Sequence, residues 1–275
     1  DINLVNLYNS LYLYIGSPAW QFKPSGPYPT LDMEAQLRGL LDSGELRISA
    51  LKLKSKESFV VASGLVNGNL TQRQITTGRL SMRTHVDLNN VANWLRVLPH
   101  PPELPKFSGI LNMNAELGYK GETKSPDLNF NFETKDLVFD KFRIGAISGK
   151  ALATLTSLKS DRITLSNEAG PAHFNAVDVA WKPEIKFQSN LEVEQLELKQ
   201  LLTNLGIPGV PLHLDLKGKL PCKGTDNTHL DIKCDGKLQG SNHEVKNESG
   251  KKTIVKAKEF TGKGQAFVDE KRVRW

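Results

Sequence analysis

Residues 31–37 read LDMEAQL, and residues 111–117 read LNMNAEL. In both heptapeptides every second residue is apolar, in the same order of Leu, Met, Ala and Leu, and polar residues stand between them. This period of two predicts a β-strand with one apolar face and one face in water. A third copy, LDLKGKL at 214–220, has Leu at three of the four apolar positions and Gly at the other.

The same alternation continues through most of the chain. A short turn and another alternating strand follow each heptapeptide: GELRISA at 44–50, PDLNFNF at 126–132 and THLDIKC at 228–234. Gly, Asn, Asp, Ser and Pro residues separate the alternating runs, as expected of turns. We therefore predict a mostly β chain of roughly 14 to 16 strands.

Three short segments have helical spacing instead: INLVNLYNSL at 2–11, VDLNNVANWL at 86–95 and LELKQLLTNL at 196–205. Apolar offsets of three and four residues lie along one side of a helix, so each segment predicts a short amphipathic helix. A Pro- and Gly-containing link and one of the heptapeptides follow each segment. We predict one continuous elongated β-rich fragment over 1–275, with internal repeats of approximately 1–84, 85–195 and 196–275, the last incomplete.

The apolar face of such a sheet has to be covered. A second packed sheet would cover it and give a β-sandwich. The sheet could instead curl so that the face lines a groove, with the short helices as plugs. The pattern of residues leaves both arrangements open.

The order of helix, Pro/Gly link and alternating strands resembles the AsmA-like superfamily, most closely its TamB members. The resemblance is clearest in SGELRISALKLKSKESFVVASGLVNGNL at 43–70 and GILNMNAELGYKGETKSPDLNFNFETKDLVF at 109–139. It implies an elongated, repeat-built antiparallel sheet curled lengthwise into an open groove (a β-taco), with acyl chains in its apolar interior. It also implies a parent anchored in the inner membrane of a Gram-negative bacterium, which crosses the periplasm and contacts an outer-membrane protein.

The function implied by the resemblance is phospholipid transport between the two membranes. Exposing two chains of about 16 carbons to water costs on the order of 20 kcal/mol or more, at about 0.8 kcal/mol per methylene, and an apolar groove removes most of that cost. The alternative is a rigid scaffold segment of an envelope-assembly or secretion machine, with a dry core and no ligand. The candidate groove residues are Leu31, Met33, Leu37, Ile48, Phe59, Val61, Leu111, Met113, Leu117, Phe130, Phe132, Ile163, Leu165, Val179, Ile185, Phe187, Val193, Leu214, Leu216, Leu220 and Ile232.

The two cysteines, Cys222 and Cys234, share the parity of the nearby apolar residues Leu220 and Ile232. If this segment forms a hairpin with its turn near residue 228, both sulfurs fall on its apolar face. The pair then forms either a cross-strand disulfide or two buried thiols. A disulfide would indicate an oxidising compartment.

We expect no catalytic, cofactor or metal site. The histidines are scattered, and the sequence has no HExxH, GxSxG, Walker or GxGxxG motif. The spacing of Cys222, His229, Cys234 and His243 matches no standard zinc module. The acids at 192–197 alternate with apolar residues, as on the wet face of a strand.

The composition is an ordinary globular balance, 39% hydrophobic and 24% charged, with a net charge of +6. Only the segment 246–274 is plainly basic, which is typical of a lysine-rich strand surface or of an anion-attracting end. Nucleic-acid binding would need exposed aromatics among basic residues on one face, and we expect none. Since the chain has no run of about 18 apolar residues, no initiator Met and no signal peptide, we expect a piece of a longer protein.

Overall fold

The computed structural model describes the backbone of residues 2–7, 10–15, 19–22, 31–40, 44–69, 74–95, 106–121, 125–182, 184–207, 212–226, 231–246, 253–269 and 272–274, and side chains over narrower ranges within these segments. The chain divides into two compact units, unit 1 (Asp1–Glu133) and unit 2 (Thr134–Trp275). Strands make up most of both, so the prediction of a mostly β, antiparallel chain with few helices is confirmed. The groove and the repeat boundaries stay predictions.

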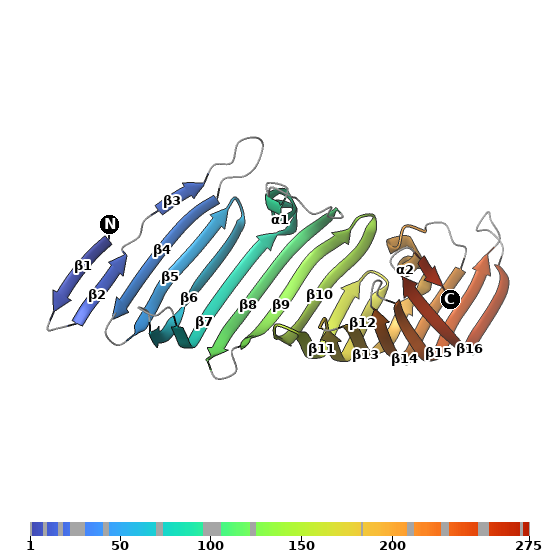
Figure 1. The fold of residues 1–275 in the computed structure, drawn as a ribbon. Helices are drawn as coiled ribbons and strands as arrows, with labels where there is room; N and C mark the ends of the chain where they lie inside the picture. The colour runs from blue at the N-terminus through green and yellow to red at the C-terminus, as the bar shows by residue number, and fades with distance from the viewer. Residues whose placement is uncertain are drawn as a thin grey trace. The chain divides into compact units, whose positions relative to one another are not determined.

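Unit 1 consists of antiparallel strands that lie side by side in chain order (Figure 1). Each strand pairs with the next along the chain, except that β4 pairs with both β2 and β3. The two heptapeptides lie in β4 and β8. The strands are β1 (Ile2–Leu7), β2 (Ser10–Ile15), β3 (Ala19–Phe22), β4 (Leu31–Leu40), β5 (Glu45–Ser55), β6 (Ser58–Asn69), β7 (Gln74–Asp87), β8 (Phe107–Lys120) and the first part of β9 (Ser125–Phe139).

Unit 2 follows the same plan, with antiparallel pairing between consecutive strands (Figure 1). The third heptapeptide lies in β14. The strands are the remainder of β9, β10 (Phe142–Ala153), β11 (Ser157–Asn167), β12 (Gly170–Ala180), β13 (Ile185–Glu197), β14 (Leu212–Asp226), β15 (Asp231–Lys246), β16 (Thr253–Asp269) and β17 (Arg272–Arg274).

Two of the three predicted helices form. Helix α1 (Leu88–Leu95) joins β7 to β8, and α2 (Leu198–Asn204) joins β13 to β14, each beginning two residues later than predicted. The Asp87 carboxylate accepts a hydrogen bond from the Asn89 backbone N–H at 2.9 Å and so caps α1. Gly206, at φ +75°, follows the end of α2. In the part of the chain that the structure describes, no helix is both long and apolar enough to cross a membrane.

The predicted helix at 2–11 is wrong, because this segment forms β1 and the start of β2. The two strands pair with Leu7 opposite Ser10. Ile2 and Leu4 are two residues apart, and SLYLYI at 10–15 alternates, so a period of two competes with the helical stripe. The β-branched and aromatic residues of this stretch also favour a strand.

β-bulges accompany a change in the spacing of apolar residues. In β5 the apolar positions run Leu46, Ile48 and then Leu51, and the register shifts between Ile48 and Leu51. In β12 they run from Phe174 to Val177, and the register shifts in the same interval. A bulge inserts one extra residue, so an apolar spacing of three keeps both sets of side chains on one face.

Candidate functional site

The candidate site in unit 1 is an apolar face that runs across β5 to β8. Directly paired residues in an antiparallel sheet project to the same side, so the register defines the face. Ala62 of β6 pairs with Met82 of β7, which pairs with Ala115 of β8. We call the following residues the apolar face of unit 1: Ile48, Leu51, Leu53, Val60, Ala62, Leu80, Met82, Leu111, Met113, Ala115 and Leu117.

The large side chains of this face remain partly exposed. Leu80, Met82 and Met113 are only half-buried, whereas Ala62 and Ala115 are 6% and 4% exposed. A packed second layer would bury the longest side chains most deeply. Here the longer neighbours cover the alanines and keep part of their own surface accessible. Among the described side chains of unit 1, the apolar face therefore has no tight protein cover.

Phe130 and Phe132 of β9 extend the apolar face of unit 1. Gly118 lies on the opposite side, and a Cβ there would meet the Asp127 carboxylate at 3.4 Å. Asp127 therefore belongs to the other face, and alternation places Phe130 and Phe132 on the apolar one. Their ring centroids are 5.7 Å apart, and both side chains are half-buried.

Phe59 and Val61 are on the opposite face, so grouping them with the other candidates is wrong. Phe59 pairs with His85 and Val61 pairs with Arg83, and the Phe59 and His85 rings stack at 5.5 Å. The stretch from Phe59 to Ala62 is apolar at both parities, so its sequence cannot select a face. The register selects Val60 and Ala62.

Several residues of the apolar face of unit 1 are not among the candidates predicted from the sequence. Leu80 and Met82 alternate with Arg79, Ser81 and Arg83, which is a recognisable strand signal. Leu51 and Leu53 also alternate in the sequence, and the bulge in β5, which changes the parity after Ile48, places them on the same face as Ile48. Leu31, Met33 and Leu37 lie in β4, and their side chains are outside the described residues.

Unit 2 has an apolar face of its own, defined by the same pairing rule. Leu165 pairs with Ala172, which pairs with Val193. Several side chains are buried here, including Val177 and Val193, each 5% exposed. We call the following residues the apolar face of unit 2: Leu158, Ile163, Leu165, Ala172, Phe174, Val177, Val179, Phe187, Leu191, Val193, Leu196, Leu216, Leu220 and Cys222.

The remaining predicted residues of unit 2 differ in their surroundings. Leu214 is 7% exposed on β14, the strand that α2 contacts. Ile185 opens β13 and is 38% exposed. Ile232 pairs with Gly224, and its side chain is outside the described residues.

Buried hydroxyl groups satisfy backbone groups beside the bulges of unit 2. Ser160 donates its hydroxyl proton to the Lys150 carbonyl at 2.6 Å. Ser189, only 1% exposed, donates to the Asn175 carbonyl at 3.1 Å, next to the bulge in β12. A bulge removes backbone groups from the ladder, and a buried group without a partner destabilises the fold. These hydroxyls let the strands bend without that penalty.

A disulfide joins Cys222 of β14 to Cys234 of β15. The two residues are directly opposite each other in the register, as expected for a hairpin with its turn near residue 228. Cys222 is buried among the residues of the apolar face of unit 2, with an exposure of 1%. Because both cysteines are bonded, neither is available as a zinc ligand.

The opposite faces carry charges that are paired across strands. Arg79 contacts Glu116 at 2.6 Å, and this hydrogen bond raises the pKa of Arg79 above its ordinary value. Lys219 contacts Glu192 at 2.6 Å, and its hydrogen bond, followed by its charge, lowers the pKa of Glu192. Among the described side chains, no group of three or more His, Cys, Asp or Glu is placed to hold a metal ion.

A scan against protein-family models finds no match for this chain, and searches of curated proteins and of solved structures find none either.

Proposed function

We propose that the apolar faces carry phospholipid acyl chains and that the protein performs no catalysis. The observation that carries this proposal is the half-buried state of the large side chains on the apolar face of unit 1. Apolar surface left in water is unfavourable by about 25 cal/mol per Å², so a ligand that covers it gains that free energy. An acyl chain is apolar along its whole length and matches a face that crosses several strands.

The bulges support a curled sheet rather than a flat one. A bulge bends its strand and increases the local twist. In unit 2, β11 and β12 each have a bulge, and the two bulges lie side by side. Ser160 pairs with Val177 on one side of the two bulges, and Arg162 pairs with Asn175 on the other side. Bends at one level in adjacent strands would curl a sheet about an axis across those strands. We propose that this bend turns the apolar face into an open groove.

The proposed setting is the periplasm of a Gram-negative bacterium. The Cys222–Cys234 disulfide favours an oxidising compartment, and the periplasm is one. By resemblance to TamB proteins, the parent would be anchored in the inner membrane and would contact an outer-membrane protein. This chain would then hold acyl chains in transit between the two membranes.

A pair of variants on the two opposite faces of β9 tests the acyl-chain proposal. Phe130→Asp places a carboxylate on the apolar face of unit 1, and Asn131→Asp places one on the exposed opposite face. Mass spectrometry of lipids extracted from the purified proteins measures the bound phospholipid. We expect phospholipid with the native protein and with Asn131→Asp, and at least about tenfold less with Phe130→Asp, since a bound acyl chain would bury the carboxylate and a buried charge is strongly disfavoured.

The scaffold alternative gives a different pattern. A scaffold would carry no acyl chains after purification and would take up none from added phospholipid, and that result would overturn the proposal. Leu214→Asp is the control for a buried position that holds no ligand. Because Leu214 is buried, this substitution should unfold unit 2 whichever function is right. Phe130→Asp should instead keep the native circular dichroism spectrum, since Phe130 is only half-buried.

A further inference from the structure

At one end of the strands β10 to β13, unit 2 has an apolar tip, defined here as Leu155, Trp181 and Ile185. Leu155 lies in the turn between β10 and β11, Trp181 follows β12, and Ile185 opens β13. Their exposed fractions are 54%, 37% and 38%. Trp181 and Ile185 are one step beyond the Ala180–Lys186 pair of the β12–β13 hairpin, so they are neighbours.

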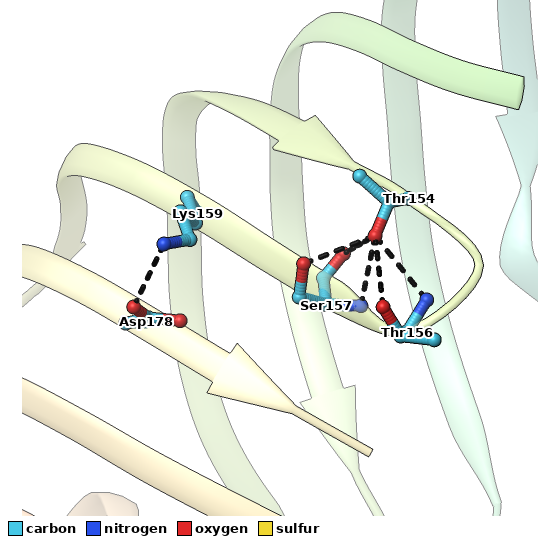
Figure 2. A network of polar contacts seen from close by, with 5 residues as sticks. All are labelled: Thr154, Thr156, Ser157, Lys159 and Asp178. Atoms are coloured by element: carbon cyan, nitrogen blue, oxygen red, sulfur yellow. Dashed lines mark hydrogen bonds and ion pairs between the residues drawn. The ribbon is translucent and has the colours of Figure 1, made fainter. Parts of the chain in front are cut away.

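The turn that holds Leu155 satisfies its own backbone groups. The Thr154 hydroxyl oxygen accepts hydrogen bonds from the backbone N–H groups of Thr156 at 3.2 Å and Ser157 at 3.1 Å (Figure 2). The Thr154 backbone N–H donates to the Ser157 carbonyl at 2.8 Å. The Thr154 and Ser157 hydroxyls are 3.0 Å apart. This network fixes the turn and leaves few of its polar groups in need of water.

Trp181 also takes part in this network, and both its backbone N–H and its indole N–H have hydrogen-bond acceptors there. Its backbone N–H donates to the Thr156 carbonyl at 3.0 Å, and its indole Nε1–H donates to the Leu155 carbonyl at 2.8 Å. A buried indole ordinarily needs an acceptor for this N–H. Because the acceptor is already present, the indole can enter an apolar medium without leaving a donor unpaired.

The size of the apolar tip favours a lipid surface over a protein partner. The surface area of a large side chain is up to about 250 Å², so one that is exposed by a third to a half presents about 100 Å² of apolar surface to water. The three side chains of the tip together present roughly 300 Å². A stable protein interface buries about 800 Å² on each partner. Insertion into a bilayer requires only a few protruding side chains and rewards polar groups that are satisfied internally.

The charges around the tip are nearly balanced. Lys159 contacts Asp178 at 3.2 Å, and Lys186 contacts Glu184 at 3.5 Å. Lys182 is exposed beside Trp181 and can extend its ammonium group to the lipid headgroups. Apolar insertion, rather than attraction to anionic lipid, is therefore the expected source of binding.

We infer that the apolar tip of unit 2 inserts into the interfacial layer of a phospholipid bilayer. Trp181 and Ile185 alternate with Ala180 and Lys186 and so lie on the same side as Val179 and Phe187, at the end of the apolar face of unit 2. The two contacts are distinguished because the tip variants should lose flotation and still carry the phospholipid that mass spectrometry detects. The test is flotation of the native protein with phosphatidylcholine vesicles, compared with a variant carrying Leu155→Ser and Ile185→Ser and with a third that adds Trp181→Ser. The matched control is Ile75→Ser, which removes an apolar side chain that is 50% exposed in unit 1.

We expect native protein and Ile75→Ser to float equally, the double variant to bind about tenfold less, and the triple variant to bind less still. Bromine-labelled phospholipid should quench native tryptophan fluorescence, and Trp181→Phe should remove that quenching. Native protein that stays unbound, or variants that float as well as native protein, would overturn the inference. A native dimer in gel filtration that the double variant dissociates would overturn it in favour of a protein contact.

Discussion

Gly64→Ala probes the close approach of two strands on the apolar face of unit 1. Gly64 of β6 pairs with Ile48, beside the bulge in β5, and with Leu80 of β7. A Cβ at this position would overlap the Arg79 carbonyl oxygen and lie 2.8 Å from the Leu80 Cα. Because both atoms belong to the backbone of β7, no rotamer change relieves the overlap. Overpacking costs about 1–3 kcal/mol, and we expect the upper end of that range.

Gly78→Ala is the matched control, because Gly78 also lies in this ladder, opposite Val66. A Cβ at Gly78 would have its nearest contacts at 3.8 Å. We expect the Gly78 variant to change the unfolding free energy by no more than about 1 kcal/mol, since Gly→Ala also restricts the unfolded chain. With a urea m-value of about 3 kcal/mol/M, Gly64→Ala should lower the midpoint by about 1 M. Equal midpoints for the two variants, measured by far-ultraviolet circular dichroism, would refute this account of the strand spacing.

Three further predictions concern unit 2. Ser189→Ala should lower the unfolding free energy by about 1–3 kcal/mol, because the buried Asn175 carbonyl loses its hydrogen-bond donor. Ser166→Ala is the control at an exposed position and should have little effect in the same urea titration. Replacing both Cys222 and Cys234 by Ser should lower the unfolding free energy by about 3 kcal/mol, for a separation of 12 residues between the cysteines. Adding reductant to this variant should cause no further loss of stability. A variant as stable as the native protein would contradict the prediction. The pKa of Glu192 is lower in the folded protein than in the unfolded chain, so the unfolded chain binds the proton more readily. The resulting stabilisation is present above the ordinary Glu pKa and is lost as the pH falls through the pKa of Glu192 in the folded protein. Glu192→Gln should therefore make the unfolding free energy depend less steeply on pH in the acid range, and an unchanged dependence would rule out the contribution.

The sequence predicted the class of fold because alternation is a local property. The heptapeptides in β4, β8 and β14 indicate strands by their period of two, whichever partner each strand finds. The segments that became α1 and α2 were recognisable for a similar reason, from apolar offsets of three and four. The parity of Cys222 and Cys234 was also readable, because both lie on one hairpin.

The bulges could have been partly anticipated from the sequence. An apolar spacing of three inside an alternating run, as from Ile48 to Leu51 or from Phe174 to Val177, is the signal that accompanies them. The location of the polar partner could not be anticipated in the same way. Ser189 lies on the strand next to the bulge it supports, and only the pairing of β12 with β13 brings its hydroxyl to Asn175.

The sequence by itself therefore determined that the chain is built from alternating strands with an apolar and a polar side. Only the tertiary structure decided which residues share the apolar face of unit 1, because Phe59, Val60, Val61 and Ala62 offer both parities and the pairing of β6 with β7 selects one. The strand structure of β1 and β2 likewise depends on their pairing with each other, which the helical spacing at 2–11 did not reveal. The physical reason is that a shift of one residue in register moves every side chain of a strand to the other face, and register is fixed by hydrogen bonds to a neighbouring strand.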